Sequence, residues 1–237
     1  MNKFWNEEIP SGYYDEILTN GIKKNKGIQP NWHHSTFAHI KDLLVETDVH
    51  LDYACGPGTL IGRYLDSKSI GVDISKSQIE YATNKYGSEG KFYNLNDFEL
   101  DKYDNFFDKI TILGLFEFIN DDEVISLLNR LYLALKEGGE IYITTPNYKS
   151  SMLIFEKILN LIGSVNYQEQ HINRFDEKRL KQLMNESKFS KIEVKKILNL
   201  GVFFGIVSFD FSKKIQIMFD KLTNKNFGYL LLGILKK

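Results

Sequence analysis

The sequence has a single cysteine, Cys55, and only four prolines among its 237 residues. One cysteine excludes an intramolecular disulfide, so the composition does not point to an oxidising compartment. No apolar run reaches the roughly 20 residues that a membrane-spanning helix needs. The start of the chain also lacks the apolar stretch and small-residue cleavage site of a signal peptide. We therefore expect a cytoplasmic protein.

Neither sign of charge dominates, because 30 basic and 31 acidic side chains give a net charge of −1. The distribution is uneven: residues 1–120 carry 12 basic and 18 acidic side chains, whereas residues 178–237 carry 13 basic and 4 acidic ones. A basic C-terminal region can attract an anionic substrate, a lipid surface or nucleic acid, or it can be a solvated lysine-rich face. We favour the solvated face, leave peripheral membrane contact open and do not expect nucleic acid as a partner.

Short β-rich runs alternate with helical patterns from about residue 48 onward. The expected strands are residues 49–54, 69–74, 91–95, 107–113, 140–145, 191–198 and 227–236. Alternation of strands and helices with short connections is typical of βαβ units and predicts a mostly parallel sheet. The chain length suits one such α/β domain.

Polar residues mark the expected starts of three helices. Ser75 with Gln78, and Asn120 with Glu123, have the spacing of a capping box, in which each side chain caps the other's backbone. Asp176 is expected to cap a further helix.

Two stretches fall outside the alternation, residues 1–40 and about 147–173. Within the second, Leu153–Ile162 has the pattern of an amphipathic helix. Ligands of open α/β sheets bind beyond the carboxyl ends of the strands, and both stretches attach where they could cover that edge. We therefore predict an N-terminal lid at 1–40 and a main domain at 41–237 with a substrate-side insertion at 147–173.

The motif with most chemical content is Asp52-Tyr-Ala-Cys-Gly56-Pro-Gly58, which follows the first strand. Glycines in a tight strand-to-helix turn let the backbone approach a ligand and point amide hydrogens at it. Asp73 ends the second strand, where a carboxylate can accept hydrogen bonds from both ribose hydroxyls. Asp52 would repel a pyrophosphate over the turn but would attract the ammonium of a methionine moiety. This charge pattern favours S-adenosylmethionine over a dinucleotide.

At these residues the sequence resembles the class I S-adenosylmethionine-dependent methyltransferases. The resemblance covers about residues 40–200 and rests on four segments in the family's usual order, at residues 49–60, 71–75, 107–118 and 135–146. One departure is Ala54, which stands where the family's first motif usually has a glycine. The resemblance implies a doubly wound, mostly parallel seven-stranded sheet with helices on both faces. Its implied strand order is 3-2-1-4-5-7-6, with one antiparallel strand.

The resemblance also implies which residues would contact the cofactor. The expected set comprises Asp52, Ala54, Gly56 and Gly58 at the methionine and ribose end, Asp73 at the ribose, Ile74 on the adenine, Asn96 or Asp97 at the adenine amino group with Phe98 stacked beside it, and Leu113 and Gly114 at the methionine amine. S-adenosylhomocysteine would be the product. A plain turn at residues 96–97 is the alternative for that pair.

The acceptor side is less constrained by sequence. Methyl transfer from a sulfonium mainly requires a close, collinear acceptor and exclusion of water, and a general base only when the acceptor must lose a proton. The candidate catalytic residues are His171, which precedes the helix capped by Asp176, and Glu117, which follows the fourth strand. Related proteins often have a histidine after this glutamate, but Phe118 stands there. His171 could instead only pack or hydrogen-bond a loop.

The N-terminal segment carries five aromatic or imidazole rings that could reach the site: Tyr13, Tyr14, Trp32, His33 and His34. They would contact the sulfonium by cation–π attraction or simply pack in a lid. The histidines at 33, 34 and 39 do not share one helical face and have no nearby cysteine, so no metal site is expected.

The function predicted from sequence is methyl transfer from S-adenosylmethionine to oxygen or nitrogen of a small molecule. Apolar stretches at 152–162 and 198–206 beside the basic region suggest an acceptor with apolar and anionic parts, such as a quinone precursor, a lipid or a sugar conjugate. The alternatives are methylation of RNA or protein, and a non-catalytic cofactor-binding partner subunit. A dinucleotide-dependent dehydrogenase is disfavoured, although Gly56, Gly58 and Gly62 fit a loose dinucleotide fingerprint. The oligomeric state stays open.

Overall fold

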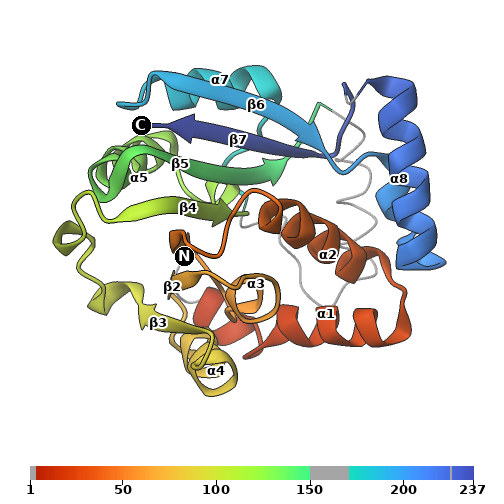
Figure 1. Cartoon of the computed structure of the whole chain (residues 1–237), viewed down its shortest axis with the longest axis horizontal. Coiled ribbons are helices and arrows are strands. Elements are labelled where there is room, and N and C mark those ends of the chain that lie inside the picture. Colours follow the sequence, from red (N-terminus) through yellow and green to blue (C-terminus); the bar gives the residue numbers. More distant parts are fainter. Residues whose placement is uncertain (1–3, 150–170, 225) are drawn as a thin grey trace.

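The protein, described by a computed structural model over residues 4–149, 171–224 and 226–237, is built around a seven-stranded sheet (Figure 1). The strand order is β3-β2-β1-β4-β5-β7-β6. The strands are β1 Val49–Tyr53, β2 Lys68–Asp73, β3 Gly90–Asn94, β4 Phe107–Leu113, β5 Leu135–Pro146, β6 Lys191–Ile197 and β7 Leu230–Lys236. The first five pair in parallel, and β7 runs antiparallel between β5 and β6. The predicted fold class and strand order are confirmed.

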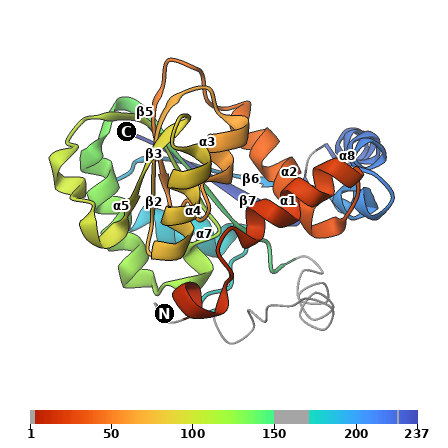
Figure 2. The ribbon, with the colours of Figure 1, turned by 90° about the horizontal axis from the view of Figure 1, so that it is seen from below.

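Helices cover both faces of the sheet (Figure 2). They are α1 Tyr13–Lys24, α2 Ile28–Lys41, α3 Thr59–Tyr64, α4 Lys76–Tyr86, α5 Asp121–Ala134, α7 Glu177–Asn185 and α8 Phe209–Thr223. On one face, buried leucines of α5 and α7 pack against isoleucines of the central strands, in the larger core. On the other face, α1, α2 and α3 enclose a smaller core that includes Tyr142 and Leu232. Ile110 and Ile112 of β4 are fully buried, as expected for a central parallel strand.

Two of the three predicted helix caps are confirmed. Asn120 and Glu123 form a reciprocal capping box at the start of α5, and the Asp176 side chain accepts a hydrogen bond from a backbone amide of α7. The capping box predicted for Ser75 and Gln78 is wrong. Both residues begin α4, but their side chains bond the N-terminal segment instead.

The N-terminal segment, residues 4–41, is held to the sheet domain by polar contacts with α3 and α4. The Ser75 hydroxyl donates to the carbonyl of Trp5, while the Gln78 side chain donates to the carbonyl of Pro10 and accepts from the amide of Gly12. The backbone makes a tight turn at Gly12 (φ 72°) and lies close against α4. A Cβ at this position would lie 2.2 Å from the Tyr81 ring, so the contact leaves no room for a side chain. Ser75 and Gln78 therefore use their side chains to hold the N-terminal segment and not to cap α4.

Asp15 of α1 is the centre of a second contact between these segments. Its carboxylate is fully buried and accepts hydrogen bonds from four side chains, those of Arg63, Tyr81, Lys85 and Tyr86. Burial opposes ionisation of this group, but hydrogen bonds led by that from Lys85 outweigh it and lower the pKa of Asp15 below its ordinary value. The N-terminal segment is thus fixed by one buried charge with two cationic partners.

The chain after β6 packs beside the N-terminal segment. A short 3-10 helix, η5 (Leu200–Ile206), leads into α8, and both contact α2 or the loop before it. The amphipathic helix predicted at Leu153–Ile162 lies outside the described residues. None of the helices in the described ranges has the length and apolar character that crossing a bilayer requires.

Candidate active site

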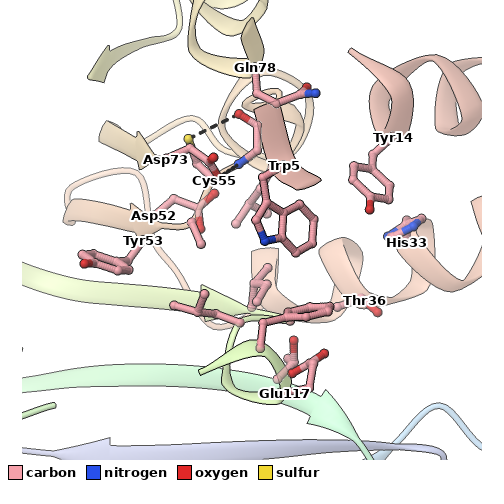
Figure 3. A pocket seen from close by; sticks show the side chains of 18 of the residues that line it. Trp5, Tyr14, His33, Thr36, Asp52, Tyr53, Cys55, Asp73, Gln78 and Glu117 are labelled. Carbon is pink, nitrogen blue, oxygen red and sulfur yellow. Dashed lines mark hydrogen bonds between the residues drawn. The ribbon is translucent and has the colours of Figure 1, made fainter. Parts of the chain in front are cut away.

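A large cavity opens at the carboxyl edge of the parallel strands, where open α/β sheets bind their ligands (Figure 3). Its volume is about 1240 Å³, above the range of about 300–1,000 Å³ usual for a site that holds one drug-sized ligand. The loops after β1, β2 and β4 form one wall, and residues of the short helix η1 (Phe4–Glu8), α1, α2 and η5 form the opposite one. The space therefore suits two ligands side by side.

The turn after β1 forms the floor of the cavity and has an unusual backbone. Ala54, Gly56 and Gly58 all have positive φ angles, of 65°, 53° and 73°. A Cβ on Gly58 would lie 2.6 Å from the Phe92 ring, so this glycine permits close packing beneath the turn. A Cβ on Gly56 would meet nothing within 4 Å, because this residue borders the open cavity. The sequence motif thus folds into a tight turn in which three residues have a left-handed backbone conformation.

Asp73 ends β2 at the cavity wall and is fixed by the same turn. One carboxylate oxygen accepts a hydrogen bond of 2.8 Å from the Gly56 amide, and the other accepts one of 2.8 Å from the Ser75 amide. Burial raises the pKa of Asp73, and these amide bonds partly offset the shift. Each oxygen keeps a lone pair for a further donor, as a bidentate contact to a ribose diol requires.

Asp52, at the end of β1, also faces the cavity but is held differently. Only 3% of its surface is exposed, and its carboxylate accepts a hydrogen bond of 2.6 Å from Thr111 Oγ1 on β4. Burial, opposed in part by this bond and reinforced by the charge of Asp73, raises the pKa of Asp52 to about 7. A cation beside Asp52 would relieve this burial cost.

Thr59, the first residue of α3, was missed in the sequence. Its Oγ1 is buried at the cavity wall and finds no hydrogen-bond partner among the described residues. Buried hydroxyls are rarely left unpaired in folded proteins. A polar ligand group next to the glycine turn would satisfy it. The sequence signal was its place at the start of the helix after the motif, where backbone amides already favour anionic groups such as a carboxylate.

The residues after β3 only partly match their predicted role. Ile74 and Leu95 line the cavity, whereas Asn96 and Asp97 are exposed in a short turn beside it. Phe98 was predicted to stack beside the adenine, but it is buried within a ring cluster, with centroids 5.8 Å from Tyr93 and 5.0 Å from Tyr103. Leu95 takes the wall position in its place. The reason is the 3-10 turn, which directs Phe98 back into the core.

The loop after β4 lines the cavity at Leu113 and Gly114, as predicted. Gly114 has φ 70°, and its amide donates to the carbonyl of Thr144 on β5. This bend directs the following 3-10 helix, η4 (Phe116–Phe118), across the mouth of the parallel strands. The contact of Leu113 and Gly114 with a methionine amine stays a prediction.

Glu117 of η4 is a buried carboxylate at the cavity wall. It is 4% exposed, and one of its oxygens accepts a hydrogen bond of 3.1 Å from Thr145 Oγ1. Burial raises the pKa of Glu117 to about 7. Its backbone carbonyl accepts from the amides of Ile172 and Asn173, which places the loop carrying His171 directly beside it.

His171 lines the same part of the cavity. Its Nδ1 lies 3.2 Å from the hydroxyl of Tyr148, and its ring centroid lies 5.0 Å from that of Phe118. The structure therefore brings both predicted catalytic candidates, Glu117 and His171, together at the cavity wall, on two segments joined by backbone hydrogen bonds.

The opposite wall comes from the N-terminal segment and is largely aromatic. It contains Tyr13, Tyr14, Trp32 and His33 of the predicted set, and also Trp5, which the sequence did not single out. Figure 3 shows the Trp5 ring between the side of Asp52 and Asp73 and the side of Tyr14 and His33. Burial lowers the pKa of His33 to about 4, so this ring is neutral at pH 7.

His34 faces away from the cavity wall. Its Nδ1 lies 2.7 Å from the Tyr64 hydroxyl, and its ring stacks on Phe209. Of the two neighbouring histidines, only His33 is therefore placed to meet a ligand. In the described parts of the chain, no group of three or more His, Cys, Asp or Glu side chains is arranged to hold a metal ion.

Comparison with known proteins identifies the family. A family model described as a methyltransferase domain matches residues 19–194. The chain belongs to this methyltransferase family. Its cofactor is accordingly S-adenosylmethionine, and the left-handed turn, the two flanking acids and the unsatisfied Thr59 hydroxyl of this structure fit that molecule.

Individual relatives are distant. The methyltransferase is 28% identical to an uncharacterized protein of Rickettsia prowazekii, over 60% of this chain and 61% of the relative. It is 29% identical to a probable fatty acid methyltransferase of Pseudomonas putida, over 39% of this chain and 25% of the relative. The chain thus spans less than two thirds of the length of either. A solved structure from Thermotoga maritima, described as a possible histamine N-methyltransferase, superposes with a TM-score of 0.62 at 16% identity, covering 86% of this chain and 90% of that one.

Proposed function

We propose that this methyltransferase transfers a methyl group to oxygen or nitrogen of a small, largely apolar molecule. The observation that supports the proposal is the division of the cavity. The acids Asp52 and Asp73 lie at one end, an aromatic chamber lies at the other, and the buried carboxylate of Glu117 lies where the two meet. Bound at the acidic end, S-adenosylmethionine supplies an electrophilic methyl group on a sulfonium.

The chamber favours an apolar acceptor. Trp5, Tyr14, Trp32, Phe37 and Phe203 line it, and such rings bind apolar or aromatic groups and exclude water from the reacting atoms. The similarity to a probable fatty acid methyltransferase, although it covers only a short part of each chain, agrees with an acceptor that has a long apolar part.

The proposal omits the anionic part expected from the sequence. Among the described residues of the cavity wall, Arg130 is the sole lysine or arginine, against five acids: Asp52, Asp73, Glu117, Asp122 and Glu123. An anionic group inside the cavity would therefore meet more repulsion than attraction. The basic surface of the C-terminal region lies outside it, and the same charge balance disfavours RNA as a substrate.

We assign Glu117 as the general base. A base works best when its pKa is near the working pH, and burial raises that of Glu117 to about 7. Its place at the meeting of the two parts of the cavity lets it take a proton from an acceptor hydroxyl or ammonium. His171, held near Tyr148 and Phe118, would position the acceptor from the adjoining loop.

The test is methyl release against a panel of apolar hydroxy and amino metabolites, with the wild type, Asp73→Ala and Glu117→Gln. We expect turnover with an apolar acceptor, loss of S-adenosylhomocysteine binding in Asp73→Ala, and loss of turnover with retained binding in Glu117→Gln. A protein that binds S-adenosylhomocysteine but methylates only RNA or protein would contradict the acceptor class. One that binds it and methylates nothing would favour the non-catalytic partner subunit.

A further inference from the structure

The outer surface of α8 is apolar where a surface helix is normally polar. Phe211, Met218 and Leu222 are 40%, 47% and 72% exposed and recur at a spacing of seven and four residues, which places them on one stripe. Phe209 and Ser212 are the buried residues of this helix and face the protein. In Figures 1 and 2, α8 lies at the margin of the molecule, beside α1 and α2.

The stripe continues onto η5 and the residues that join it to α8. The Phe204 ring contacts that of Phe211 edge to face, at a centroid distance of 5.6 Å. Ile206 and Val207 are 65% and 61% exposed. We call the six residues Phe204, Ile206, Val207, Phe211, Met218 and Leu222 the α8 face. A contiguous exposed apolar patch of this kind marks an interaction site more often than an ordinary surface.

The charges around the α8 face are predominantly basic. Lys213, Lys214 and Lys221 are exposed on the same helix. The two acids of the helix bond to the protein: Asp210 accepts from the Asn25 side chain, and Asp220 accepts from that of Asn199. An exposed apolar stripe flanked by lysines is the pattern of a helix that lies in the interface of an anionic bilayer.

The α8 face is continuous with the cavity of the active site. Phe203 and Ile206 of η5 line the cavity, and Ile206 also belongs to the exposed face. An apolar molecule at the α8 face therefore has an apolar path into the chamber. A soluble acceptor would gain nothing from this arrangement, whereas one dissolved in a bilayer would avoid transfer through water.

We propose that the α8 face docks this methyltransferase on a membrane surface that contains anionic lipids. Its apolar side chains enter the boundary between headgroups and acyl chains, and its lysines contact the lipid phosphates. Docking depends only on the α8 face. The further step, in which the acceptor enters the cavity from the bilayer beside Ile206, also depends on the proposed function.

The test is co-sedimentation of the whole protein with two kinds of vesicle. One contains phosphatidylcholine alone, and in the other phosphatidylglycerol makes up about one third of the lipid. Met218→Ser/Leu222→Ser removes two apolar contacts, and Lys214→Gln/Lys221→Gln removes two charges. We expect binding to the anionic vesicles, weakened roughly tenfold or more by either double substitution. Leu133→Ser, on a leucine of α5 that is about as exposed as Met218 (48% against 47%), is the matched control and should bind as the wild type does.

Three outcomes would overturn docking. They are equal binding to both kinds of vesicle, no binding to either, and binding that neither double substitution weakens. A second copy of the chain could cover the same face, so sedimentation velocity without lipid belongs to the experiment. A dimer that Met218→Ser/Leu222→Ser converts to a monomer would assign the face to self-association.

The readouts separate this proposal from the proposed function. Calorimetry with S-adenosylhomocysteine should give the same affinity for the wild type and all three variants, which verifies that the variants are folded. Binding to vesicles is measured without a methyl acceptor, and methylation of a soluble acceptor is measured without vesicles. Either proposal can therefore fail while the other holds.

Discussion

Thr111 Oγ1 donates a hydrogen bond of 2.6 Å to Asp52, across the pair of central strands β4 and β1. The same hydroxyl lies 2.9 Å from Nε2 of His50, whose Nδ1 lies 3.0 Å from the Ser69 hydroxyl. Burial lowers the pKa of His50 to about 3, so the ring is neutral. Because Thr111 uses its proton on Asp52, it accepts from the Nε2 proton of His50. A chain of neutral donors thus holds the Asp52 carboxylate in place beneath the cavity.

We expect cofactor binding to release protons at neutral pH. With a pKa of about 7, Asp52 is about half protonated at pH 7 before binding. The ammonium of the methionine moiety favours the carboxylate form and lowers this pKa, so affinity is full above pH 7 and falls as the pH drops below it. Calorimetry with S-adenosylhomocysteine in phosphate and in Tris buffer at pH 7 measures the release through the difference in heat.

Two variants control for this effect. Asp52→Asn should abolish the difference between the buffers and weaken binding by about 10- to 100-fold, because a hydrogen bond to a charged group is lost. Thr111→Val should raise the pKa of Asp52 further and shift the proton release to higher pH. Equal heats in both buffers for the wild type would show that Asp52 is ionised before binding.

The Glu117 assignment predicts a pH dependence of catalysis. Because a base acts in its ionised form, kcat/KM for the acceptor, measured at saturating S-adenosylmethionine, should rise with pH, with a midpoint near 7, and then level off. Glu117→Gln should lose this dependence and about 10²- to 10⁴-fold of the rate, while its affinity for S-adenosylhomocysteine changes little. Glu99→Gln, an exposed residue paired with Lys102, is the control. A pH-independent rate in the wild type would favour an acceptor that attacks through a lone pair without a base.

Much of the fold was predictable because its signals are local. The seven strands alternate with helices in a regular way, and Asn120 and Asp176 cap their helices through bonds to residues three positions away. Asp52 and Asp73 were predictable as cavity residues because strand ends meet at one edge of a parallel sheet. For these features, sequence spacing and spatial proximity coincide.

The features that were missed depend on contacts between distant parts of the chain. The side chains of Ser75 and Gln78 fit a local capping box, yet they bond residues 70 and 68 positions away. Phe98 fits an adenine contact by its place after β3, but its packing with Tyr103 decides its direction. The hydroxyl of Thr59 is noticeable only once its surroundings show that it lacks a partner.

Asp15 should stabilise the attachment of the N-terminal segment in a pH-dependent way. Its pKa is lowered in the folded protein, so its contribution is complete above the unfolded value near 4 and is lost as the pH falls below it. Asp15→Asn should cost about 1–3 kcal/mol at pH 7, since the partly exposed Lys85 and Arg63 can turn to solvent. Urea unfolding at pH 7 and pH 3 measures the cost and its loss in acid.

The control for Asp15 is Asp66→Asn, which removes an exposed ion pair with Lys41. Such surface pairs contribute about 0–1 kcal/mol, so little change is expected. Hydrogen exchange should also locate the effect, with faster exchange in α1 of Asp15→Asn and unchanged exchange in α5 and α7. A uniform loss of protection would mean that Asp15 supports the whole fold and not this attachment.

The backbone at Ala54 predicts a substitution to glycine that does not destabilise. Ala54 has φ 65°, in the left-handed region, which costs a residue with a side chain roughly 1–2 kcal/mol. Ala54→Gly removes this strain but adds a backbone entropy cost of about 0.5–1 kcal/mol on folding, so the net change should lie between zero and a gain of about 1.5 kcal/mol. Ala38→Gly, in the interior of α2, should instead lose about 1 kcal/mol, because its conformation is already favourable for alanine. Urea unfolding of both variants gives the comparison. If both variants lost the same free energy of unfolding, the backbone at Ala54 would carry no strain that glycine relieves.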